Sequence, residues 1–76
     1  MSQRLPAVKP KAVIRALQRG GFFIHHTSGS HQILKHPSKP DVRVTVPFHN
    51  KDLKRKTLAS IVDQAGYTQE EFITLL

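Results

Sequence analysis

The fold is decided by one continuous stretch, Phe22-Phe23-Ile24-His25-His26-Thr27-Ser28-Gly29-Ser30-His31-Gln32-Ile33-Leu34-Lys35-His36. Its middle, residues 27–30, is an unbroken run of turn-forming residues in which Gly29 can supply a positive φ. The residues on both sides are rich in β-formers. The stretch therefore predicts a β-hairpin with strands over residues 22–26 and 31–36.

His31 is the first residue after this turn, where a strand fixes the backbone and leaves the ring near the open edge of the hairpin. Histidine can both accept and donate a proton near neutral pH. Two interpretations follow from the position alone. His31 is either a proton-transfer group or an ordinary polar residue of the strand.

The segments outside the hairpin complete an α+β domain. Residues 37–41 predict a second turn, and the alternating valines of residues 42–46 predict a third strand that ends at Pro47. Apolar spacing predicts a helix from Pro10 to the Gly20-Gly21 pair, a longest helix over residues 51–65, and a short last helix that Thr68 caps together with Glu71. The expected order is αβββα with a terminal α, and the helices cover one face of a three-stranded antiparallel sheet.

Length and composition bound the function. The chain has 76 residues, so we expect one domain over residues 9–76 after a loose leader at residues 1–8. It has no cysteine, which excludes disulfides and thiolate metal sites. No secretory signal or membrane-length apolar run is present, so we expect a cytoplasmic protein without a membrane partner.

The charge distribution points to a polyanionic partner. The net charge is +7, and the first 40 residues contain seven Lys and Arg but no acid. A small domain this basic most often binds nucleic acid. We expect phosphate contacts from a cluster of bases at the start of the long helix and from two arginines that share a face of the first helix: Lys51, Lys54, Arg55 and Lys56, with Arg15 and Arg19.

Taken in order, these residues resemble the HicA family of bacterial mRNA interferase toxins. The resemblance runs from about Lys11 to Leu76, and its carriers are Gly21-Phe22, Gly29-Ser30-His31, Val44-Thr45-Val46-Pro47 with His49, Thr57-Leu58, Ile61, Gln64-Ala65-Gly66 and Phe72. It implies a double-stranded-RNA-binding-domain-like fold and an endoribonuclease that cleaves mRNA with His31 as the catalytic residue. It also implies a HicB-like antitoxin that covers the active surface, which is compatible with a hetero-oligomer. One departure is Lys56, where many relatives carry glycine.

The chemistry expected of His31 is general acid–base catalysis. RNA carries its own nucleophile, the 2′-OH, so a nuclease needs a base for that proton, a donor for the leaving 5′-oxygen and positive charge on the phosphate. His31 suits the base. His49 and His26 are candidates for the second proton transfer, and water is a further one. Gly29 and Ser30 support the site: Gly29 shapes the turn, and Ser30 either positions the phosphate or is a plain turn residue.

Two alternative functions fit the same fold without catalysis. One is a non-catalytic RNA-binding module, and the other is a protein-interaction domain with a basic face. A metal site is not expected, because the five histidines are dispersed and adjacent His25 and His26 should point to opposite faces of the sheet. No cofactor is expected.

Overall fold

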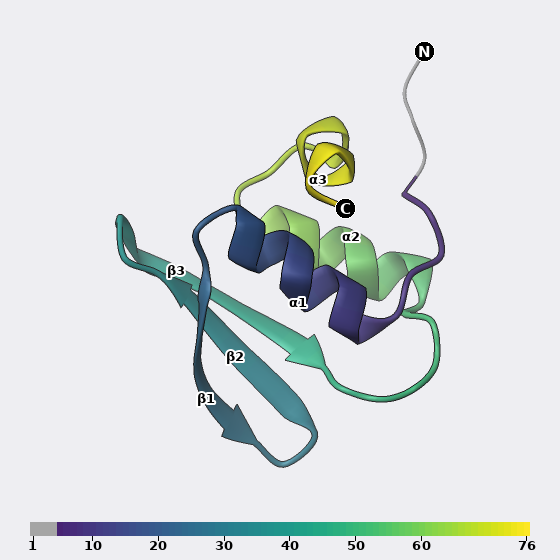
Figure 1. Cartoon of the computed structure of the whole chain (residues 1–76), viewed down its shortest axis with the longest axis horizontal. Helices are drawn as coiled ribbons and strands as arrows, with labels where there is room; N and C mark the ends of the chain where they lie inside the picture. The colour runs from purple at the N-terminus through teal and green to yellow at the C-terminus, as the bar shows by residue number, and fades with distance from the viewer. Residues whose placement is uncertain (1–4) are drawn as a thin grey trace.

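The computed structural model describes residues 5–76, which form three helices around a three-stranded sheet (Figure 1). The elements follow in the order α1 (Pro10–Arg19), β1 (Phe23–Ser28), β2 (His31–His36), β3 (Lys39–Pro47), α2 (Arg55–Gln64) and α3 (Gln69–Leu75). The strands form an antiparallel meander with β2 in the centre. The predicted αβββα order with a terminal helix, and the α+β class, are confirmed.

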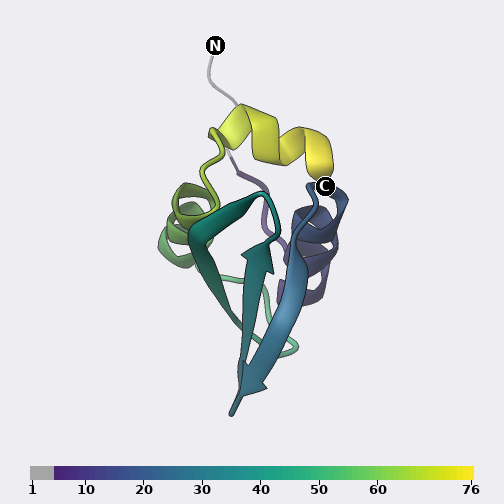
Figure 2. The ribbon, with the colours of Figure 1, turned by 90° about the vertical axis from the view of Figure 1, so that its left-hand side faces the viewer.

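Two layers make the core. Helices α1 and α2 lie side by side against one face of the sheet, and α3 lies across their ends (Figure 2). The three predicted valines of β3 point inward as expected, with Val44 and Val46 fully buried and Val42 packed at the margin. Side chains from all three helices and two strands fill the interior: Val13, Leu17, Leu34, Leu58, Ile61, Val62 and Phe72.

The hairpin turn is tighter than the sequence indicated. Strand β1 continues through Thr27 and Ser28, and the loop contains only Gly29 and Ser30. Gly29 has φ +59°, whereas Ser30 does not have a positive φ. A positive φ at the first loop residue alone is the pattern of a type II′ turn, whose twist matches that of the flanking strands.

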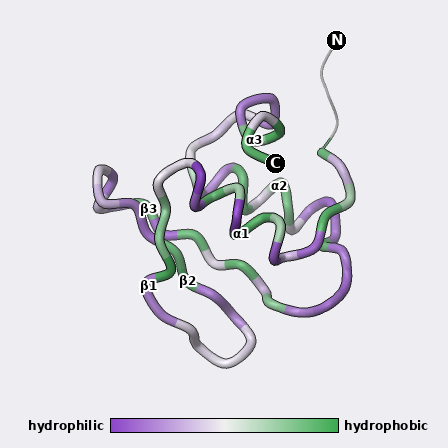
Figure 3. Tube along the Cα trace, viewed as in Figure 1, coloured by the Kyte–Doolittle hydropathy of each residue, from purple (hydrophilic) through white to green (hydrophobic). Residues whose placement is uncertain are grey.

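The start of α2 differs from the prediction. The helix begins at Arg55, not at Lys51, and with ten residues it equals α1 in length. The cause is a tether, because Leu53 is buried and its N–H donates to the Val8 carbonyl over 2.8 Å. Lys54 then has extended backbone angles as the N-cap. Residues 51–54 are thereby held as a non-helical connector, which is hydrophilic along most of its length (Figure 3).

The chain ends are tied to the core at two points. Part of the expected leader, residues 1–4, lies outside the described residues, whereas Leu5 is buried in the core and Val8 packs against it. At the other end, the Thr68–Glu71 capping box forms as predicted and starts α3. Among the helices of residues 5–76, none has the length and apolar character that crossing a bilayer needs.

Candidate active site

His31 starts the central strand, with a neighbour on each side. It lies opposite Ser28 of β1 and opposite Pro47 of β3. The Ser30 carbonyl just before it accepts a hydrogen bond of 2.6 Å from the N–H of Phe48, which fastens the turn to the end of β3. The His31 side chain is exposed. A rigid backbone therefore presents an accessible imidazole.

The ring lines an open depression of 360 Å³ between the sheet and α2. Thr45 and Pro47 form the strand side of this depression, and Lys56 and Thr57 belong to its helix side. The helix is held to the strand by Gln64, whose Oε1 accepts from the Thr45 N–H over 3.3 Å. His31 and a lysine from the first turn of α2 thus share one concave surface, hereafter the His31 depression.

The four bases of the predicted cluster line three different hollows. Lys56 belongs to the His31 depression, whereas Lys51 and Lys54 line a second depression of 330 Å³. The two depressions share Pro47 and Thr57, so they are adjacent. Arg55 lines a third hollow, with Pro6 and Leu53. Three of the four bases therefore border the surface that begins at His31.

His49 lines the second depression together with Lys51 and Lys54. Its Nδ1 accepts a hydrogen bond of 3.1 Å from the backbone N–H of Lys51. In the neutral ring, Nε2 then carries the hydrogen and is the atom available to donate. His49 is thus oriented by its own loop, next to the His31 depression.

His26 lies on the edge strand β1, opposite Ile33, and is outside the His31 depression. The prediction that His25 and His26 point to opposite faces is wrong. A β-bulge between Ile24 and His26 interrupts the alternation, and the two rings contact each other with their Nδ1 atoms 2.7 Å apart and their centroids 5.0 Å apart. Among residues 5–76, no three His, Asp or Glu side chains form a group that could hold a metal ion.

The two arginines of α1 have separate surroundings. Arg15 is exposed and borders a hollow between α1 and the hairpin, with Ile24 and Phe48. The guanidinium of Arg19 donates to the Leu75 carbonyl over 2.7 Å and so caps the last turn of α3. Arg15 therefore lies at the hairpin side of the helix, whereas Arg19 is engaged at the α3 side.

His36, the fifth histidine, is part of the framework. Its Nε2 is 3.0 Å from the Gly20 carbonyl, and its Nδ1 accepts from the N–H of Ser38 over 3.1 Å. Only the tautomer with hydrogen on Nε2 makes both bonds. Its ring also meets the Phe22 ring edge-on at a centroid distance of 5.0 Å. Both ring nitrogens are used, so His36 is not a candidate for proton transfer.

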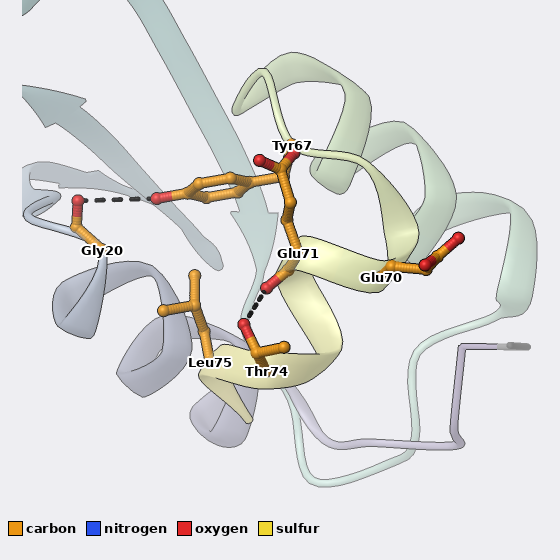
Figure 4. Close-up of a pocket in the computed structure, with 6 residues that line it drawn as sticks. All are labelled: Gly20, Tyr67, Glu70, Glu71, Thr74 and Leu75. Atoms are coloured by element: carbon orange, nitrogen blue, oxygen red, sulfur yellow. Dashed lines mark hydrogen bonds between the residues drawn. The ribbon is translucent and has the colours of Figure 1, made fainter.

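A further depression, of 530 Å³, lies between α3 and the end of α1 (Figure 4). Glu70 and Glu71 line it, so its charge opposes phosphate. The Tyr67 hydroxyl reaches across it to the Gly20 carbonyl at 3.5 Å. Burial raises the pKa of Tyr67, and the charge of Glu71 adds to the rise. Hydrogen bonds from the backbone and side chain of Thr68 lower the pKa of Glu71. This depression is unsuited to an RNA substrate.

Two features of the site were not found from the sequence. One is the Thr45–Gln64 link beside the His31 depression, which joins a strand N–H to a side chain 19 positions later and so has no local signal in the sequence. The other is the exposed Phe48, 44 % accessible, directly after the end of β3.

Comparison with known proteins agrees with this arrangement. No curated protein matches the sequence. A sequence model described as the HicA toxin of bacterial toxin–antitoxin systems matches residues 10–67, from the first residue of α1 to the residue before the α3 cap. The match includes every element of the His31 depression. The chain therefore belongs to the HicA toxin family, and as the toxin of such a system it has an antitoxin partner.

Proposed function

We propose that the protein is a metal-independent endoribonuclease that cleaves mRNA, with His31 as the general base. The observation that carries the proposal is the shared depression, in which an exposed imidazole lies with Lys56 at the first turn of a helix. An imidazole can take up the proton of the 2′-OH, and a lysine ammonium stabilises the negative charge that develops on the phosphate.

The reaction requires two proton transfers. His31 removes the 2′-OH proton, the 2′-oxygen bonds to phosphorus, and the bond to the 5′-oxygen breaks with its electron pair. The leaving oxygen takes up a proton, which yields a 2′,3′-cyclic phosphate and a free 5′-hydroxyl. His49 is the first candidate for that donor, because its depression adjoins that of His31. To act as the acid it must be the imidazolium, which requires its Nδ1 to release the hydrogen bond from the Lys51 N–H. His26 is second, because its Nδ1 already contacts His25.

The test is cleavage of labelled RNA by purified protein in EDTA, with wild type, His31→Ala and His25→Ala compared. Loss of an acid–base group should lower the rate by about 10²-fold or more. His25 is an exposed histidine of the same hairpin and lines neither the His31 depression nor the second one, so His25→Ala is a matched control. His31→Gln keeps polarity and approximate size if the alanine variant is unstable. Wild-type cleavage by folded His31→Ala protein refutes the role of His31.

The same assay separates the alternative of a non-catalytic RNA-binding module. That module would retain RNA without cutting it, whereas the proposed enzyme cuts in EDTA. The broad basic border of the site accounts for binding in either case, and only the imidazole accounts for cleavage.

We further propose that the antitoxin is HicB-like and inhibits by covering the His31 depression. The surface to be covered is cationic and exposed, so a partner with acidic side chains there is electrostatically complementary. Addition of the cognate antitoxin at an equimolar amount should abolish cleavage. A complex that cleaves RNA at the rate of the free toxin contradicts masking.

A further inference from the structure

A hollow of 260 Å³ between α1 and the hairpin has a composition different from the His31 depression. Two large apolar side chains lie open in it, Phe48 at 44 % exposure and Ile24 at 42 %. Lys11 and Arg15 of α1 border them. Phe48 lies outside the hydrophobic core, and its exposed ring beside two cations suits an occupant that has both an apolar face and negative charge.

The hollow is adjacent to the catalytic residue through the backbone. Phe48 directly follows Pro47, which is the register partner of His31, and partners in an antiparallel pair have Cα atoms about 4.5–5.5 Å apart. The Phe48 N–H is also bonded to the carbonyl before His31. The backbone therefore fixes the position of Phe48 relative to His31, with the end of β3 between the two residues.

We infer that this hollow binds an unpaired nucleobase of the RNA, next to the phosphate that is cut. The base stacks on the Phe48 ring, and Arg15 and Lys11 contact the neighbouring phosphate. Gln32 lines the same hollow, and its Oε1 already accepts from Thr27 over 2.9 Å, so its NH2 group is the part left to meet an acceptor on the base. The inference rests on the proposed ribonuclease function and adds that the substrate is single-stranded at this nucleotide.

The alternative occupants are less complementary. A duplex buries its bases and presents no free face to Phe48. A partner protein would match the two cations only if it placed a carboxylate beside the apolar group that covers Phe48, and antitoxin binding is therefore measured as a separate outcome. An unpaired nucleotide satisfies both the ring and the charges.

The experiment measures binding of two uncleavable probes by fluorescence anisotropy. One is a short single-stranded 2′-O-methyl oligoribonucleotide, which lacks the free nucleophile, and the other has the same backbone without bases. Phe48→Ala should weaken binding of the first probe by about fivefold or more and leave the second unchanged. Phe23→Ala is the matched control, because Phe23 is a phenylalanine of the same 44 % exposure on β1, outside the hollow.

Each outcome is decisive. Equal affinities of wild type and folded Phe48→Ala protein for both probes refute the base site, as does an equal loss for Phe23→Ala. If Phe48→Ala is unstable, Phe48→Leu keeps apolar volume without a ring and should show the same selective loss. An effect of Phe48→Ala on antitoxin binding alone would make the hollow a protein-docking surface and overturn the inference. Failure of the proposed function is seen separately, as absence of cleavage of unmodified RNA by the wild type.

Discussion

Replacement of Lys56 by Ala should slow the chemical step more than it weakens RNA binding. Lys56 lines the His31 depression, whereas Arg55, one position earlier, lines a different hollow with Leu53. Successive helix residues point about 100° apart, which explains the separation. Two cations of the same helix turn thus differ in access to the scissile phosphate.

The magnitude follows from Coulomb's law. A cation about 4 Å from a phosphate oxygen gains about 1 kcal/mol in bulk water and about 4 kcal/mol at the effective dielectric constant near a protein surface. Lys56 is exposed, and only the charge that increases in the transition state affects the rate. We therefore expect a loss of about 1–2 kcal/mol, or about 5- to 30-fold in rate. The free energy of unfolding should change by less than about 0.5 kcal/mol, because alanine suits a helix and the lysine opposes the helix dipole.

The assay is single-turnover cleavage with protein in saturating excess over RNA, together with the dissociation constant for an uncleavable 2′-O-methyl probe. Arg55→Ala is the control, and it should lower affinity while leaving the saturated rate within about twofold of wild type. Equal effects of the two substitutions on the saturated rate would refute the assignment of Lys56 to the reacting phosphate. So would a wild-type rate for Lys56→Ala.

Three further outcomes are expected. RNA affinity should fall steeply with salt, by about 0.7 log units per decade for each phosphate contacted on a single strand, and a flat titration would contradict electrostatic binding. Gly21→Ala should lower the free energy of unfolding by about 1 kcal/mol or more beyond the loss caused by Gly66→Ala, as measured by thermal unfolding. Both glycines have a positive φ, +99° and +83°, but only at Gly21 would an added Cβ approach His36, at 2.6 Å. Equal losses would contradict a clash. Because hydrogen bonds lower the pKa of Glu71, its contribution to stability is present above its usual pKa and is lost as pH falls through the lowered value. Melting temperature between about pH 5 and pH 3 should therefore vary less in Glu71→Gln, and an unchanged slope would contradict this linkage.

Structural features that depend on one short segment of the chain were predictable from the sequence. The Gly29 turn, the alternating valines of β3 and the Thr68 capping box each depend on residues within a few positions of one another. The valines and the capping box appear in the structure as the sequence indicated, and Gly29 has the expected positive φ, although the loop contains only Gly29 and Ser30. The position of His31 at the start of a strand follows from the same turn.

Features that depend on distant partners were not predictable. The start of α2 is displaced because Leu53 bonds to Val8, 45 positions earlier in the chain. The contact of His25 with His26 requires a bulge, and nothing in their periodicity marks one. The division of the basic cluster among three hollows likewise depends on which distant segment each position of the connector or of α2 meets. Sequence spacing placed these bases on one segment but could not divide their roles.

Helices α2 and α3 differ in the capping and the charge of their N-termini. Helix α3 follows the rule for the helix dipole, with Glu70 and Glu71 in its first turn and a side-chain cap from Thr68. Helix α2 has no acid in its first turn and no side-chain cap, and its N-cap is Lys54. Stability alone favours the first arrangement, so the second is explained by what the helix end faces. The end of α2 borders the His31 depression, where we expect Lys56 and the N–H groups of the first helical turn to attract phosphate. The departure from the capping rule therefore coincides with the candidate active site.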